Sequence, residues 1–136
     1  MIASNRRAAS AYRSIGIETR AVGHDQHQLV ALMYESLLES LNAAIGAMAQ
    51  RDIASKVSHI NKALRILQEG LYANLDLERG GEISANLAAV YDYAGMALTQ
   101  ANMKNDPEKI QEVIAMIKPI AEAWAQIRND QTGAAG

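Results

Sequence analysis

The chain of 136 residues contains no cysteine and no phenylalanine, and it has only two prolines. Without cysteine there is no disulfide framework, no thiolate zinc site and no thiol nucleophile. The abundant Ala, Leu, Met, Gln and Glu are good helix formers, and continuous runs of β-branched and aromatic residues are missing. The composition therefore favours an all-α protein.

The charge balance also excludes several functions. Thirteen basic and fifteen acidic residues give a formal net charge of −2, which supplies no bulk attraction to nucleic acid or to anionic lipid. No segment approaches the roughly 18 apolar residues of a membrane span. The segment after Arg6-Arg7 is interrupted by Ser, Arg and Gly, so it lacks the apolar region of an export signal. We expect a cytoplasmic protein with neither nucleic-acid nor membrane partners.

Several residues mark the starts of helices. Asp25, with Gln28 three residues later, forms a capping box for a helix from about Gln26 to Ala49. Asp52 is the expected N-cap of a second helix, and Asp106-Pro107 places an N-cap before a proline at the first helical position of a fourth. A third helix is expected from about Glu82 to Lys104, with Glu82 at the positive end of its dipole.

The apolar residues of these helices repeat at alternating spacings of three and four. Because the helices match in length and the connections are short, the pattern predicts an antiparallel up-down-up-down four-helix bundle over residues 25–130. The wider apolar set of the first helix predicts that it is the most enclosed, and Pro119 predicts a bend in one continuous fourth helix. The expected inward residues are Ile53, Val57, Ile60, Leu64, Leu67 and Leu71 on the second helix, Ile83, Leu87, Val90, Ala94, Ala97 and Ala101 on the third, and Ile110, Val113, Ile117, Ile120, Trp124 and Ile127 on the fourth.

The two ends of the chain differ from the bundle. Residues 1–24 carry a few apolar side chains, too few for a core helix, and are expected to form a loosely packed N-terminal segment. Residues 131–136 are expected to be a disordered tail.

Sites of catalysis and metal binding find little support in the sequence. Four-helix bundles often hold two metal ions with inward Glu residues and Glu-x-x-His pairs, but this chain has no Glu-x-x-His, and His59 is expected to point outward. Gly80-Gly81 lacks the Lys-Ser/Thr of a phosphate loop and is better explained as a tight turn between helices. No serine has a histidine and an acid at a recognisable spacing. We expect no cofactor, no metal and no enzymatic activity.

Apolar side chains away from the inward faces are the candidates for binding. Ile66 and Tyr72 fall two and one residues beyond the inward Leu64 and Leu71, so they are expected to point outward. Tyr91 and Tyr93 lie on opposite flanks of the third helix, and Leu29 and Leu32 lie off the main line of the first. Each is explained either by partial burial against a neighbouring helix or by a groove that binds a partner.

The order of short motifs resembles the flagellar secretion chaperone (FliS) family over nearly the whole chain. The motifs are Ala11-Tyr12-Arg13, Gln28-Leu29-Val30, Leu32-Met33-Tyr34, Lys62-Ala63-Leu64, the segment from Leu75 to Leu87 with Gly80-Gly81-Glu82-Ile83, Tyr91-Asp92-Tyr93, Gln100-Ala101-Asn102, Asn105-Asp106 and Ala123-Trp124. The chain departs from the family pattern at Ile2, where Tyr is usual, at His24-Asp25, at Glu35-Ser36, and at Gly95-Met96-Ala97, which lacks an Arg pair.

The resemblance implies a cytoplasmic four-helix chaperone that binds the C-terminal segment of flagellin, prevents its premature polymerisation and presents it to the type III export gate. It also implies that the N-terminal segment lies over the binding surface and is displaced by flagellin. We therefore expect the partner-binding residues to be Tyr12 and Ile15 in this cover and Ile66, Tyr72, Tyr91 and Tyr93 on or beside the contact surface. The free protein is expected to be a monomer or a weak homodimer.

Two other functions stay open at this point. One is a regulatory adaptor whose main partner is an export-gate component or an anti-sigma factor. The other is a metal-dependent bundle enzyme.

Overall fold

The structure is a computed structural model that describes residues 25–135, with side chains described over residues 25–127. The expected N-terminal segment, with Tyr12 and Ile15, lies outside the described residues. The elements in chain order are α3 (Gln26–Ala49), α4 (Ile53–Arg65), the π-helix η1 (Ile66–Leu71), the 3₁₀-helix η2 (Tyr72–Asn74), α5 (Gly81–Lys104) and α6 (Pro107–Ala135).

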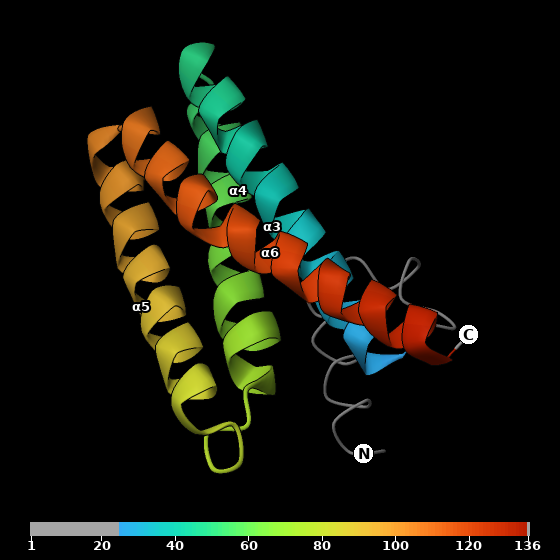
Figure 1. Ribbon diagram of the computed structural model, residues 1–136. Helices are drawn as coiled ribbons and strands as arrows, with labels where there is room; N and C mark the ends of the chain where they lie inside the picture. The colour runs from blue at the N-terminus through green and yellow to red at the C-terminus, as the bar shows by residue number, and fades with distance from the viewer. Residues whose placement is uncertain (1–24, 136) are drawn as a thin grey trace.

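The helices pack as a four-helix bundle. α3 packs against α4 and α6, and α5 packs against the same two helices. α3 and α5 therefore occupy diagonal positions. The α3–α4 and α5–α6 turns lie at one end of the bundle, and the loop that leads into α5 lies at the other (Figure 1). The predicted up-down-up-down architecture is confirmed.

Side chains cap three helix starts as predicted. The Asp25 carboxylate accepts a hydrogen bond from the Gln28 backbone N–H at 2.8 Å, while the Gln28 side chain accepts one from the Asp25 N–H at 2.9 Å. The Asp52 carboxylate accepts from the Ser55 N–H at 3.2 Å, and Asp106 accepts from the backbone N–H of Lys109 at 3.3 Å. Each bond satisfies a donor that the first helical turn leaves without a partner, which is why these short signals locate the helix starts.

The core is apolar and draws on all four helices. α3 contributes more buried apolar side chains than any other helix, in agreement with its wider apolar set. The fully buried large side chains are Leu29, Met33, Tyr34, Leu37, Leu41, Ile60, Ile66, Leu67, Leu98, Ile110 and Ile117. Leu29, expected off the main line of α3, is therefore a core residue, whereas Leu32 is half-buried.

Ile66, the first residue of the π-helix η1, does not point outward as expected. Its side chain is 0% exposed, whereas Leu64, expected to face inward, is only half-buried. The prediction placed Leu64 on the inward face, but Ile60 and Ala63 are both 0% exposed, so the face centres one residue earlier and reaches Ile66 three residues after Ala63. Ile66 and Leu67 consequently both face the core, and Tyr72 is half-buried rather than outward.

Three isoleucines that were expected to face inward are exposed. Ile53, the first residue of α4, is 67% exposed, and Ile83, in the first turn of α5, is 74% exposed. Ile127 is also exposed, on the part of α6 that follows its contact at Trp124. A periodic pattern predicts the face of a helix, but not where the neighbouring helix stops covering that face.

α6 has 29 residues, compared with 24 in α3 and in α5, and it continues through Pro119 as one helix. The expectation of one continuous helix there is confirmed. α6 also runs to Ala135, so it includes most of the stretch expected to be a disordered tail at residues 131–136. Gln and Ala favour helix, which offsets the cost of Gly133 within this stretch.

The two glycines before α5 are needed for different reasons. Gly81 has a φ of 57°, in the left-handed region that glycine adopts without strain. Gly80 donates its N–H to the Asp76 carbonyl at 2.7 Å, and a Cβ at Gly80 would lie 2.6 Å from that oxygen and 1.7 Å from Ser84 Oγ. The turn therefore needs glycine at position 81 for its backbone conformation, and glycine at position 80 because a side chain there would clash.

We predict distinct stability costs for alanine at these positions. Gly81→Ala should destabilise the fold by about 1 kcal/mol because of its positive φ. Gly80→Ala should cost about 2 kcal/mol or more, because backbone must move to relieve the clash. Gly46→Ala, on an open stretch of α3, should instead stabilise by about 0.5 to 1 kcal/mol. Guanidinium denaturation of the three variants measures this order, and equal costs at all three positions would contradict it.

Candidate partner-binding groove

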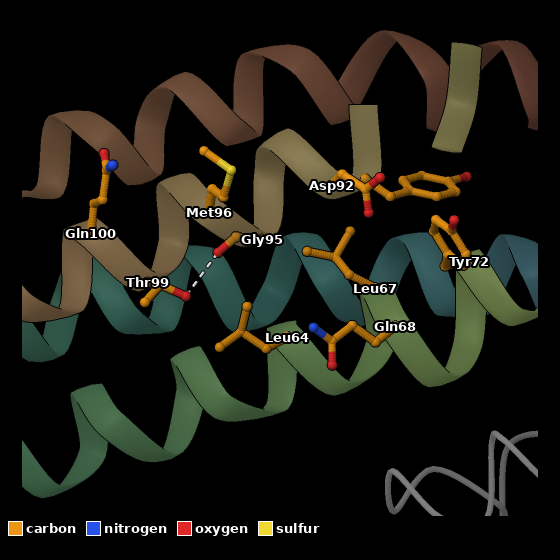
Figure 2. A pocket seen from close by; sticks show the side chains of 10 residues that line it. Leu64, Leu67, Gln68, Tyr72, Asp92, Gly95, Met96, Thr99 and Gln100 are labelled. Carbon is orange, nitrogen blue, oxygen red and sulfur yellow. Dashed lines mark hydrogen bonds between the residues drawn. The ribbon is translucent and has the colours of Figure 1, made fainter. Parts of the chain in front are cut away.

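A groove of about 460 Å³ lies between α5 and the chain segment from α4 to η2. Figure 2 shows Leu64, Leu67, Gln68 and Tyr72 contributed by the α4–η2 side and Asp92, Met96, Thr99 and Gln100 contributed by α5. The lining residues are Leu64, Leu67, Gln68, Tyr72, Tyr91, Asp92, Gly95, Met96, Thr99 and Gln100. We call this the α4–α5 groove.

The lining of the α4–α5 groove is apolar with a polar border. Met96 is 61% exposed, and Leu64 is half-buried. A Cβ added at Gly95 would lie 3.9 Å from a Leu64 methyl, so the two sides approach closely at this glycine. Thr99 donates its hydroxyl hydrogen to the Gly95 carbonyl at 2.9 Å. Apolar area bordered by amide and hydroxyl groups suits a peptide segment better than a small charged substrate.

A buried pair of tyrosines holds part of the groove wall in place. The hydroxyl groups of Tyr34 on α3 and Tyr91 on α5 are hydrogen-bonded at 2.5 Å across the diagonal of the bundle. Burial raises the pKa of both phenols, and the neighbouring Tyr34 raises that of Tyr91 further. Both groups therefore stay neutral, and the hydrogen bond between them fixes the Tyr91 ring in the wall of the groove.

The structure brings together two of the four described residues that were predicted to bind a partner. Tyr72, the first residue of η2, and Tyr91 both line the α4–α5 groove. Ile66 belongs to the core and does not line it. The roles of Tyr72 and Tyr91 in binding a partner stay predictions.

Tyr93 faces a different neighbour. Its hydroxyl donates a hydrogen bond to the Glu112 carboxylate on α6, which raises the pKa of the Tyr93 phenol. Glu112 also pairs with Lys109 at 3.6 Å. Tyr93 is exposed on the α5–α6 side of the bundle and does not line the groove.

Sequence reasoning missed several lining residues. Leu64 was expected to face the core, but Ala63 takes the inward position, so Leu64 borders the groove instead. Met96 and Gly95 were noted only as departures from a family pattern. A glycine inside a predicted helix, followed by a methionine away from the inward face, was a usable signal. Both features are unfavourable unless something packs there.

His27, one of the histidines near the start of α3, has a structural role. Its ring stacks on Trp124 with centroids 4.3 Å apart. Trp124 Nε1 donates to the His27 carbonyl at 2.9 Å, and the Trp124 carbonyl accepts from His27 Nε2 at 3.0 Å. These contacts fasten the start of α3 to α6.

Among the described residues, no three His, Cys, Asp or Glu side chains gather as metal ligands would. No helix among them is long and apolar enough to cross a membrane.

Most of the chain matches a known protein family. The family described as flagellar protein FliS matches residues 8–131. The flagellar secretion chaperone FliS of Salmonella typhimurium is 38% identical over 117 residues, which cover 86% of this chain and 87% of the relative. FliS of Escherichia coli is 34% identical over 120 residues, covering 88% of each chain, and FliS of Bacillus subtilis is 32% identical over 131 residues, covering 93% of each.

The tyrosine pair allows a stability prediction. Tyr34→Phe or Tyr91→Phe alone leaves one buried hydroxyl without its partner and should cost about 1 to 3 kcal/mol. The double variant removes both hydroxyl groups, so it should be more stable than the sum of the single costs indicates. Guanidinium denaturation followed by helical circular dichroism gives the coupling energy. Additive single costs would show that the hydroxyl groups do not depend on each other.

Proposed function

Because this chain belongs to the FliS family, whose named relatives are flagellar secretion chaperones, we propose that it is a cytoplasmic export chaperone for flagellin. It binds the C-terminal segment of flagellin, prevents premature polymerisation and delivers the subunit to the type III export apparatus. The observation that supports this proposal best is the α4–α5 groove, an apolar surface with no catalytic group assembled in it.

The groove suits an amphipathic segment that folds on binding. Such a segment loses conformational entropy when it orders, so it needs apolar area to cover in return. Leu64 and Met96 supply that area, and Tyr72 and Tyr91 supply aromatic surface. Because the Tyr91 hydroxyl is already bonded to Tyr34, the partner meets the ring and is expected to place an apolar side chain there.

Covering such a segment would also explain the effect on polymerisation. A flagellin segment whose apolar face lies in the groove cannot offer that face to another flagellin subunit. The chaperone then needs only to bind and release, which agrees with a lining that is mostly apolar and neutral, with Asp92 as its one charged residue.

We further propose that residues 1–24 cover the contact surface in the free protein, with Tyr12 and Ile15 as the side chains displaced by flagellin. This proposal rests on the family resemblance and on the sparse apolar content of the segment.

Calorimetric titration of the full chain with the C-terminal segment of flagellin from the same bacterium tests the main proposal. Met96→Gln should weaken binding about tenfold, because it removes apolar contact worth about 1.5 kcal/mol in the groove. Met103→Gln is the matched control, since Met103 lies on the same helix, is 77% exposed and does not line the groove. It should bind as the unaltered protein does.

Two results would contradict the proposal. Absence of binding at micromolar concentrations would remove flagellin as the partner. Equal weakening by both methionine substitutions would leave flagellin as the partner but place it elsewhere on α5.

The cover proposal has its own test. Deleting residues 1–17 should leave the thermal melting of the bundle in place and should not weaken flagellin binding, because a cover competes with the partner. Weaker binding after the deletion would make the segment part of the binding surface.

A further inference from the structure

A second hollow, of about 680 Å³, is lined by residues at and beside the α3–α4 and α5–α6 turns. These two turns lie at the same end of the bundle (Figure 1). Its lining includes Met48, Arg51, Ile53, Lys56, Asn105 and Pro107. None of its lining residues lines the α4–α5 groove. We call it the end hollow.

A buried lysine lies in the wall of the end hollow. Lys56 is only 6% exposed, and its Nζ donates to the Asn102 carbonyl at 3.1 Å and to Asn105 Oδ1 at 2.5 Å. Both acceptors are neutral, although the C-terminal end of α5 adds a partial negative charge. An ammonium group has three donors, and these two bonds use two of them.

The other charged groups of the end hollow add to this positive character. Arg51 makes no ion pair with the described residues. The Asp52 carboxylate is engaged by the Ser55 N–H at 3.2 Å and the Ser55 hydroxyl at 2.8 Å, and these bonds lower its pKa. Asp52 stays ionised, so the lining holds two cations and one anion, and its net charge of +1 favours a carboxylate.

Apolar side chains lie beside these cations. Ile53 is 67% exposed at the start of α4, Met48 is half-buried, and Pro107 is exposed. A large exposed isoleucine next to a buried ammonium group fits a ligand that combines a carboxylate with an apolar side chain.

We propose that the end hollow binds an acidic and apolar peptide segment of a protein partner, with its carboxylate at Lys56 and Arg51 and an apolar side chain against Ile53 and Met48. The α4–α5 groove differs in charge, since its lining holds Asp92 and no cation. The two sites thus select different segments. Both can be occupied at once, because they share no lining residue.

The probe is a pair of peptides, acetyl-Leu-Glu-Leu-Asp-Leu-amide and its neutral analogue acetyl-Leu-Gln-Leu-Asn-Leu-amide. Nuclear magnetic resonance titration of the full, ¹⁵N-labelled chain should show the acidic peptide shifting the backbone amide signals of Arg51, Ile53 and Asn105. The neutral peptide should bind about tenfold more weakly, because it forms no charge-assisted hydrogen bond. Added salt should weaken only the acidic peptide.

Variants separate the charge from the apolar contact. Arg51→Gly suits the φ of 57° at this position, so it removes a cation without straining the fold, and it should weaken the acidic peptide but not the neutral one. Ile53→Ser should weaken both peptides. Ile83→Ser is the matched control, an isoleucine 74% exposed near the start of α5, outside the end hollow, and should weaken neither.

The proposal is overturned if the two peptides bind equally well, if the shifted signals lie at Met96 and Gln100 in the α4–α5 groove, or if Ile83→Ser weakens binding as much as Ile53→Ser. A saturating amount of the flagellin C-terminal segment should leave the acidic-peptide shifts at Arg51 and Asn105 unchanged. Loss of those shifts would show that one partner occupies both sites. Failure of flagellin to bind would contradict the proposed function and leave the end hollow to be judged on the peptides alone.

Discussion

The hydroxyl groups of Tyr34 and Tyr91 meet between α3 and α5, and both residues are buried among the apolar side chains of the core. A buried hydroxyl without a partner is costly, so each requires the other. Their bond joins α3 and α5, the diagonal pair, and thereby fixes the spacing across which α4 and α6 pack. It also orients the Tyr91 ring in the wall of the α4–α5 groove, so the same contact serves the core and the candidate site.

Much of the fold could be predicted because the information for it is local. The side-chain caps at Asp25, Asp52 and Asp106 satisfy donors within three residues of themselves, so they can be recognised without knowledge of the neighbouring helices. The apolar spacing of each helix likewise records which face is covered. Four such helices with short connections leave few packings other than an antiparallel bundle.

The candidate site was harder to predict because it depends on contacts between helices. The inward face of α4 centres on Ala63 and not on Leu64, and a small alanine among larger apolar residues does not mark the centre of a buried face in advance. Tyr91 and Tyr93 were equivalent in the sequence, as two flanks of one helix. Only the position of α3 decides that Tyr91 is buried against Tyr34, whereas Tyr93 reaches Glu112 on α6.

The separation of core and binding surface has a physical reason. Apolar area that is reserved for a partner adds nothing to the packing of the bundle itself. The cost is tolerable here because the core draws on all four helices and does not include the exposed Met96. α5 supplies both surfaces, with small residues such as Ala94 and Ala97 toward the core and Met96 toward the solvent. Small core residues let α5 approach its neighbours closely, so the helix stays anchored while its outer face remains free to bind.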